Sequence, residues 1–154
     1  MFLYLVQHGE AKREDEDPTR GLTEKGAADV RKTALFLQSK NLSLIRVFHS
    51  NKTRAMQTAR IFADYLKPRA GLSESLDLAP LDDPEIWSKR IAGMQEDIML
   101  IGHLPFMARL AGLLLCNDKE KPLIGFKMGG VVCLSRSEDG HWAVEWMIVP
   151  EIVE

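Results

Sequence analysis

The sequence has few cysteines, no excess of basic residues and no long apolar run, and each absence excludes a class of protein. Its two cysteines, Cys116 and Cys133, lie in apolar stretches without CxxC spacing. We therefore expect two buried free thiols, not a disulfide framework or a zinc site. Lysine and arginine together number 20 against 22 acidic residues, a formal net charge of −2. This balance argues against a protein that binds nucleic acid through bulk charge.

Membrane insertion is also not expected. The longest apolar stretches, such as 110–116, are far shorter than the ~20 residues that cross a bilayer. The apolar segment 1–6 has no basic segment before it and does not have the pattern of a signal peptide. We expect a cytoplasmic protein that has neither a membrane nor a nucleic acid as its partner.

The residues that are present indicate an ordinary globular protein. The chain has 154 residues, of which 45% are hydrophobic and 27% charged. This length predicts a single domain over 1–154 with enough apolar residues for one core. Five segments have the pattern of strands: 2–7, 44–49, 97–101, 127–135 and 142–149. Four have the pattern of helices: from Thr23 as N-cap to about 40, from Ser50 as cap to the residue before Pro68, 84–94, and about 105–116.

The order of these elements predicts the fold class. Segments 10–21 and 70–83 are expected to be irregular, and 138–140 is expected to form the turn of a C-terminal hairpin. Strands alternate with helices until that hairpin. We therefore predict an α/β protein, a three-layer α/β/α sandwich. Its central sheet is expected to be mostly parallel, with an antiparallel strand from the C-terminal hairpin.

Polar residues follow three predicted strands directly. His8 and Gly9 follow the first strand, Ser50 and then Arg54 the second, and His103 the third. In open α/β sheets, ligands bind outside the carboxyl ends of the strands, so these residues are expected to share one site. Arg54 falls in the first turn of a helix, where a cation is unfavourable unless an anion is bound nearby. The pattern predicts an anion site, with phosphate as the candidate ligand.

Other candidate motifs have structural interpretations. His49 is expected to point to the opposite face from Ser50, and His141 to lie on the surface after the hairpin turn. Segment 21–26 has the G-x4-G spacing of a nucleotide P-loop, but alanines follow where that motif needs lysine and serine or threonine. A nucleotide site is therefore rejected, and no metal-ligand pattern is found.

Four segments together resemble the histidine phosphatase superfamily, specifically its short SixA-like phosphohistidine phosphatase branch. They are LVQHGEA at 5–11, RGLTEKG at 20–26, SNKTRAMQTA at 50–59 and GHLP at 102–105. The resemblance implies a phosphoglycerate mutase-like α/β fold. It also implies a hydrolase that acts on a phosphorylated protein or a small phosphorylated substrate, without a metal or another cofactor.

The resemblance also implies residue roles. His8 matches the nucleophile that forms a phosphohistidine intermediate, Arg54 a pocket arginine, and His103 the second catalytic histidine. Since His8 must attack through one nitrogen, its other nitrogen is expected to donate to a backbone carbonyl. The predicted phosphate-binding set is Gln7, Gly9, Arg20, Ser50, Arg54 and His103.

Gln7 departs from the family pattern, which has arginine at this position. A charge-assisted hydrogen bond contributes about 1.5–3 kcal/mol, against roughly 0.5–1.5 kcal/mol for a neutral one. Loss of that difference in the transition state slows the reaction about tenfold. The general acid is not identified by the pattern. Glu10, Asp15 and Asp17 are candidates, and the alternative is that they form a solvated acidic loop.

Three functions remain open at this point. The first is phosphatase activity on phosphohistidine or a small phosphoester. The second is a phospho-ligand binding module in which Gln7 has weakened or abolished turnover. The third is a phosphomutase, although the short chain leaves little room for a substrate cap. No heptad or long apolar stripe predicts association, so a monomer is expected.

Overall fold

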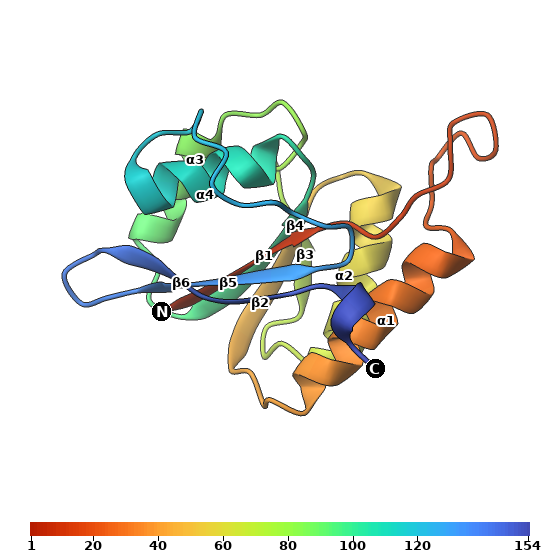
Figure 1. Cartoon of the computed structure of the whole chain (residues 1–154), viewed down its shortest axis with the longest axis horizontal. Helices are drawn as coiled ribbons and strands as arrows, with labels where there is room; N and C mark the ends of the chain where they lie inside the picture. Colours follow the sequence, from red (N-terminus) through yellow and green to blue (C-terminus); the bar gives the residue numbers. More distant parts are fainter.

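The short apolar runs of the sequence form one six-stranded sheet in the computed structural model, which describes residues 1–154 (Figure 1). Its strands are β1 (Phe2–Gln7), β2 (Leu44–His49), β3 (Leu72–Glu74), β4 (Asp97–Gly102), β5 (Val131–Arg136) and β6 (Trp142–Ile148). The order across the sheet is β3-β2-β4-β1-β5-β6. Strands β1 to β4 are parallel, while β5 is antiparallel to both β1 and β6. The predicted mostly parallel sheet with an antiparallel C-terminal hairpin is confirmed, with one strand, β3, more than predicted.

Helices cover both faces of this sheet (Figure 1). They are α1 (Glu24–Gln38), α2 (Thr53–Leu66), α3 (Pro84–Ala92) and α4 (Phe106–Cys116), and a 3-10 turn, η1, spans Pro150–Ile152. Helices α1 and α2 pack together on one face, and α3 and α4 on the other. None of the helices is both long and apolar enough to cross a membrane.

Strand β1 shows how the alternation of side chains divides the core into two layers. Leu3 and Leu5 are fully buried in the layer beneath α3 and α4. Tyr4 and Val6 point to the opposite face, into the layer beneath α1 and α2. Successive residues of a strand face opposite sides, so a strand covered on both faces is apolar throughout. This double burial holds the end of β1, and therefore His8, in a fixed position.

Four predicted boundaries need correction, whereas the predicted start of the first helix is confirmed. Thr23 is the N-cap of α1, and its hydroxyl accepts a hydrogen bond from the Gly26 N–H at 2.9 Å. Ser50, however, does not cap α2, because the helix begins at Thr53 and its N-cap is Lys52. Helices α1 and α3 end at Gln38 and Ala92, each two residues earlier than predicted. Strand β5 begins at residue 131 and not 127.

Two further expectations were wrong. The segment 70–83 contains the short edge strand β3, whose three residues pair with β2. Cys116 is exposed at the end of α4, whereas Cys133 is buried in β5 as predicted. The exposure of Cys116 follows from its position, since Asn117 turns the chain out of the helix in a left-handed conformation.

Candidate active site

The sheet order brings three strand ends together. Strand β4 lies between β2 and β1, so the residues after these strands are neighbours along one edge of the sheet. His8 follows β1, Ser50 follows β2 and His103 follows β4. The ring centroids of the two histidines are 5.0 Å apart. The structure thus places residues that are far apart in the sequence in one site.

His8 is oriented by its own backbone neighbour. Its side chain is buried, and Nδ1 lies 2.7 Å from the carbonyl oxygen of Gly9. A carbonyl only accepts hydrogen bonds, so Nδ1 carries the proton and Nε2 keeps its lone pair in the neutral ring. Burial, aided by the charges of Arg54 and Arg20, lowers the pKa of His8 to about 4, although the hydrogen bond to the Gly9 carbonyl acts in the opposite direction. The expected backbone contact is confirmed, and Nε2 is free to act as a nucleophile at neutral pH.

Gly9 is required by close packing. A Cβ atom at this position would lie 2.8 Å from Val30 Cγ2, on α1, and 3.0 Å from the Gly26 carbonyl oxygen. The Gly9 N–H donates to Thr58 Oγ1 at 3.0 Å, and that hydroxyl donates to the Arg54 carbonyl oxygen at 2.8 Å. The N–H of Gly9 is therefore already paired, and Gly9 contributes its carbonyl to the orientation of His8.

Thr58 was not singled out from the sequence, although it lies inside the segment 50–59. It is fully buried in α2 and links the loop after β1 to the first turn of that helix. Only the three-dimensional packing reveals this link, because Gly9 and Thr58 are 49 residues apart. Thr58 thereby ties the loop that carries His8 to the helix that carries Arg54.

Only one of the two ring nitrogens of His103 makes a hydrogen bond. Its Nε2 lies 2.6 Å from Ser50 Oγ, while its Nδ1 is buried and makes no hydrogen bond. Burial lowers the pKa of His103 to about 3, helped by His8 and by the charges of Arg54, Lys52 and Arg20. The ring is therefore neutral at pH 7.

Arg54 and Arg20 supply positive charge beside the two imidazoles. Arg54 stands in the first turn of α2, and its Nε is buried without a hydrogen-bond partner. Burial and the charge of Arg20 both lower the pKa of Arg54. Arg20 has a left-handed backbone (φ 51°), and its Nε donates to the Lys12 carbonyl at 3.1 Å. Two guanidinium groups held near each other indicate a site for an anion.

Lys52 is a further cation that the sequence analysis did not select. It precedes α2 as the N-cap, and its charge acts on His103. Its residue type alone carries no signal, because most lysines are solvated. The positive end of the α2 dipole adds to this charge at the same edge of the sheet.

The acidic candidates have structural contacts. Asp17 accepts hydrogen bonds from the Gly21 N–H at 3.0 Å and from the Thr19 hydroxyl at 2.8 Å, and these bonds lower its pKa. Asp17 is therefore ionised at neutral pH and has no proton to donate. Glu10 accepts from the Thr23 hydroxyl at 2.8 Å.

Asp15 and the remaining histidines complete the set of candidates. Asp15 forms an exposed ion pair with Arg13 at 3.3 Å. His49 is buried, and its Nδ1 contacts the Ser50 carbonyl at 2.8 Å. His141 is exposed on the hairpin, as predicted.

Gln7 ends β1 immediately before His8. It is paired with Gly102 of β4, and its carbonyl accepts a hydrogen bond from the Gly129 N–H at 2.9 Å. Its side chain is partly exposed. A neutral residue therefore precedes His8 in the chain, and Arg54, Arg20 and Lys52 provide the positive charge of the site.

Unsatisfied polar atoms distinguish this site from the rest of the chain. Buried side-chain nitrogens are nearly always hydrogen-bonded, so each exception requires an explanation. The two exceptions in this protein are Arg54 Nε and His103 Nδ1, and both lie here. No group of three or more histidine, cysteine, aspartate or glutamate side chains comes together in a way that could hold a metal ion. The arrangement is suited to binding an oxyanion between two arginines and two neutral imidazoles.

Known proteins share both the sequence pattern and the fold. The sequence profile of the histidine phosphatase superfamily (branch 1) matches residues 3–78. The phosphohistidine phosphatase SixA of Escherichia coli (strain K12) is 24% identical over 155 residues, covering 97% of this chain and 94% of that protein. A structure of the protein histidine phosphatase SixA complexed with tungstate has a TM-score of 0.85 and 25% identity, with 97% of both chains covered. The alpha-ribazole phosphatase from Shigella flexneri shares the fold, with a TM-score of 0.79, 13% identity and 97% of both chains covered.

Proposed function

We propose that the chain is a histidine phosphatase of the SixA-like branch, and that it hydrolyses phosphohistidine on a protein through a covalent intermediate on His8. A small phosphoester is the other substrate considered. The observation that carries the proposal is the pair of buried, unpartnered nitrogens, Arg54 Nε and His103 Nδ1, beside a neutral His8. A phosphoryl group provides the oxygens that these nitrogens lack.

The first chemical step is assigned to His8. Its Nε2 lone pair attacks phosphorus in line with the leaving group, while the Gly9 carbonyl holds the Nδ1 proton. The bond from phosphorus to the leaving nitrogen breaks as the bond to Nε2 forms. Water then attacks the phosphorylated His8 and releases inorganic phosphate, which restores the free imidazole.

Electrostatic stabilisation is assigned to the surrounding cations. A phosphoryl group in transfer spreads negative charge over its equatorial oxygens, so catalysis depends on positioning and charge. Arg20 lies close enough to Arg54 for its charge to lower the pKa of Arg54, and a bound dianion relieves this repulsion. The SixA complex with tungstate, which is an oxyanion, is consistent with this use of the site.

The lack of an identified general acid favours a phosphohistidine substrate. Asp17, one of the three acidic candidates, is held ionised by hydrogen bonds from Gly21 and Thr19. An alkyl phosphate needs a general acid to give a proton to its leaving oxygen. The imidazole of a phosphohistidine that is already protonated departs readily without a general acid. The nitrogen–phosphorus bond is therefore the easier bond for this site to break.

The test compares two peptides and two proteins. Phosphate release is measured from a phosphohistidine peptide and from a phosphoserine peptide of the same sequence, with wild type and His8→Ala. We expect rapid release from phosphohistidine by wild type, much slower release from phosphoserine, and none with the variant. Equal release from both proteins would place the chemistry elsewhere. Faster release from phosphoserine would contradict the proposed substrate class.

Gln7 favours one alternative, a phospho-ligand binding module that has lost turnover. That function predicts tungstate binding by wild type, measured calorimetrically, without hydrolysis of either peptide. Arg54→Ala is then expected to abolish the binding, because it removes a buried donor and a charge. Hydrolysis that depends on His8 would exclude this alternative.

A further inference from the structure

The contact between Ser50 and His103 joins two buried side chains. Ser50 is 1% exposed and His103 2% exposed, and 2.6 Å separates Ser50 Oγ from His103 Nε2. Distance alone does not show which atom donates, because both a hydroxyl and a ring nitrogen can donate or accept. The direction of this hydrogen bond decides which nitrogen of His103 carries the proton.

The other neighbours of Ser50 settle the direction. Its Oγ accepts the Lys52 N–H at 3.3 Å, which occupies one lone pair and leaves the hydroxyl hydrogen without an acceptor other than His103. If Nε2 were the donor, that hydrogen would be buried and unpaired, at a cost of about 1–3 kcal/mol. The hydroxyl therefore donates to Nε2, and the proton of the neutral ring resides on Nδ1.

The Nδ1 atom is the nitrogen of His103 that has no partner in the protein. With a proton, it is a hydrogen-bond donor suited to a phosphoryl oxygen. Without one, it presents a lone pair to a negatively charged oxygen, which is repulsive. The tautomer therefore decides whether His103 assists or opposes binding of the anion.

We propose that Ser50 is a positioning residue that fixes His103 in the Nδ1–H tautomer and so makes it the donor to the transferred phosphoryl group. The sequence analysis assigned Ser50 to phosphate binding, whereas here it acts through His103. The catalytic part of this inference rests on the proposed function. The tautomer itself does not, because the hydrogen bond exists whether or not the protein turns over a substrate.

Ser50 is itself held in place by two backbone contacts. Its carbonyl oxygen accepts a hydrogen bond from His49 Nδ1 at 2.8 Å, and its N–H donates to the Ile101 carbonyl at 3.3 Å. The second contact ties Ser50 to β4, the strand that His103 follows. His49 thus has a role on the sheet, supporting the loop that carries the serine.

The tautomer is measured by nitrogen-15 NMR of the histidine rings in the protein without ligand. In wild type we expect His103 Nδ1 to have the shift of a protonated nitrogen and Nε2 that of an unprotonated one. Ser50→Ala is expected to lose this preference, so that the Nε2–H form appears. Ser50→Thr keeps the hydroxyl and adds one methyl group at a residue that lines a cavity of about 60 Å³. It is expected to preserve the wild-type tautomer.

Binding of tungstate gives a second readout. Loss of one oriented donor predicts about tenfold weaker binding by Ser50→Ala, with recovery in Ser50→Thr. The matched control is Thr33→Val, which removes a buried hydroxyl of α1 that contacts only its own helix, at the Asp29 carbonyl. We expect the control to leave both readouts unchanged.

A proton on Nε2 of His103 in wild type would overturn the inference, as would a wild-type tautomer and unchanged tungstate affinity in Ser50→Ala. An inactive wild-type protein with the Nδ1–H form and Ser50-dependent binding would contradict the proposed phosphatase function and still support the assignment of Ser50. The two claims therefore fail separately.

Discussion

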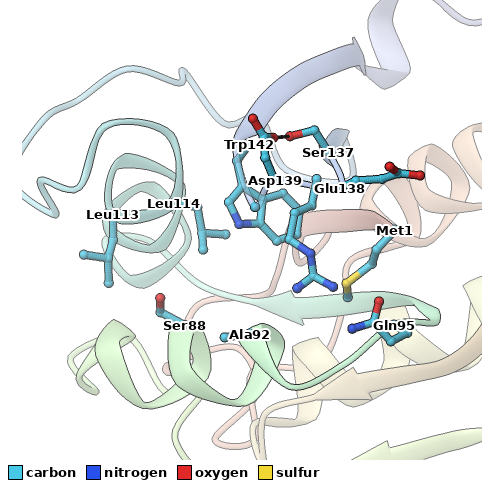
Figure 2. Close-up of a pocket in the computed structure, with 12 residues that line it drawn as sticks. Met1, Ser88, Ala92, Gln95, Leu113, Leu114, Ser137, Glu138, Asp139 and Trp142 are labelled. Atoms are coloured by element: carbon cyan, nitrogen blue, oxygen red, sulfur yellow. Dashed lines mark hydrogen bonds between the residues drawn. The ribbon is translucent and has the colours of Figure 1, made fainter.

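The two ends of the central sheet each hold a partly buried arginine, and the two arginines differ in whether their donors are paired. At the carboxyl ends of β1, β2 and β4, Arg54 Nε is buried without a partner. At the other end, Arg136 lines a cavity of about 550 Å³ between α3, α4 and the β5–β6 hairpin (Figure 2). Arg136 donates to the carbonyl oxygens of Ile91 and Met94 and lies over the ring of Trp142.

This difference shows that buried nitrogens without hydrogen-bond partners identify the candidate site better than cavity volume does. The cavity in Figure 2 is large, but its arginine already holds the end of α3 to the sheet. The cavity that adjoins Ser50 is only about 60 Å³. The functional end is recognised because its buried nitrogens need a ligand, whereas those of Arg136 are bonded within the protein.

The largest effect is expected from Arg54→Met. The change removes a charged donor to the phosphoryl group, whose interaction is worth about 1.5–3 kcal/mol. We expect kcat/KM on a phosphohistidine peptide to fall about 10- to 150-fold, with the unfolding midpoint in urea close to wild type. A variant with wild-type kcat/KM would mean that the unpaired Nε is not aimed at the substrate.

The matching change at the other end is Arg136→Met. It leaves the Ile91 and Met94 carbonyls without their donor, so the free energy of unfolding is expected to fall by about 1–3 kcal/mol in urea titrations. The kcat/KM of the folded protein is expected to stay at the wild-type value. A loss of activity without a loss of stability would reverse the comparison between the two ends.

Gln7→Arg is expected to have a smaller effect, of the opposite sign. It adds a third guanidinium to the site, and we expect kcat/KM to rise about tenfold because a neutral hydrogen bond becomes charge-assisted. The measurement is steady-state hydrolysis of the phosphohistidine peptide at fixed pH and ionic strength. A variant no faster than wild type would show that the present cations already neutralise the phosphoryl group.

The pH dependence of the free energy of unfolding is expected to depend on the two buried histidines at the carboxyl ends of the strands. The folded pKa values of His8 and His103, about 4 and about 3, lie below the ordinary value of 6.5. Between pH 6.5 and about 4, the unfolded chain therefore binds protons that the folded protein does not, and stability falls as the pH is lowered. Since one pKa unit corresponds to about 1.4 kcal/mol, each histidine is expected to contribute more than ~1 kcal/mol to this loss.

The check is a series of urea titrations from pH 7 to 4.5. His8→Asn combined with His103→Asn is expected to flatten the slope of stability against pH. His141→Asn is the control, because His141 is exposed on the hairpin at the opposite end of the sheet. A slope unchanged in the double variant would mean that the two buried histidines do not lose their protons on folding.

The sequence predicted what depends on local pattern. Apolar runs and capping residues identify β1, β2, β4 and the four helices, and the strand ends identify His8 and His103. The Nδ1 contact of His8 was also predictable, because the role that the family resemblance implies for His8 requires an unprotonated Nε2. Strand β3 was missed because its three residues carry no apolar alternation and are ordered by pairing with β2.

Contacts between distant residues were not predictable. Ser50 has the residue type of a helix cap, yet its hydroxyl bonds to His103, 53 residues away, and α2 begins later. Thr58 and Lys52 likewise acquire their roles only when α2 is packed against the loop after β1. The position of Asp17 in the sequence made it a candidate general acid. In the structure, hydrogen bonds from Gly21 and Thr19 lower its pKa and keep it ionised.

The most direct test of the central claim is to trap the phosphorylated enzyme. Protein mixed briefly with a labelled phosphohistidine peptide is quenched in base, which preserves phosphohistidine, and the labelled residue is identified by mass spectrometry. The account predicts one labelled residue, His8, and no label in His8→Ala. Turnover with no label on His8, or a label that persists in His8→Ala, would contradict it.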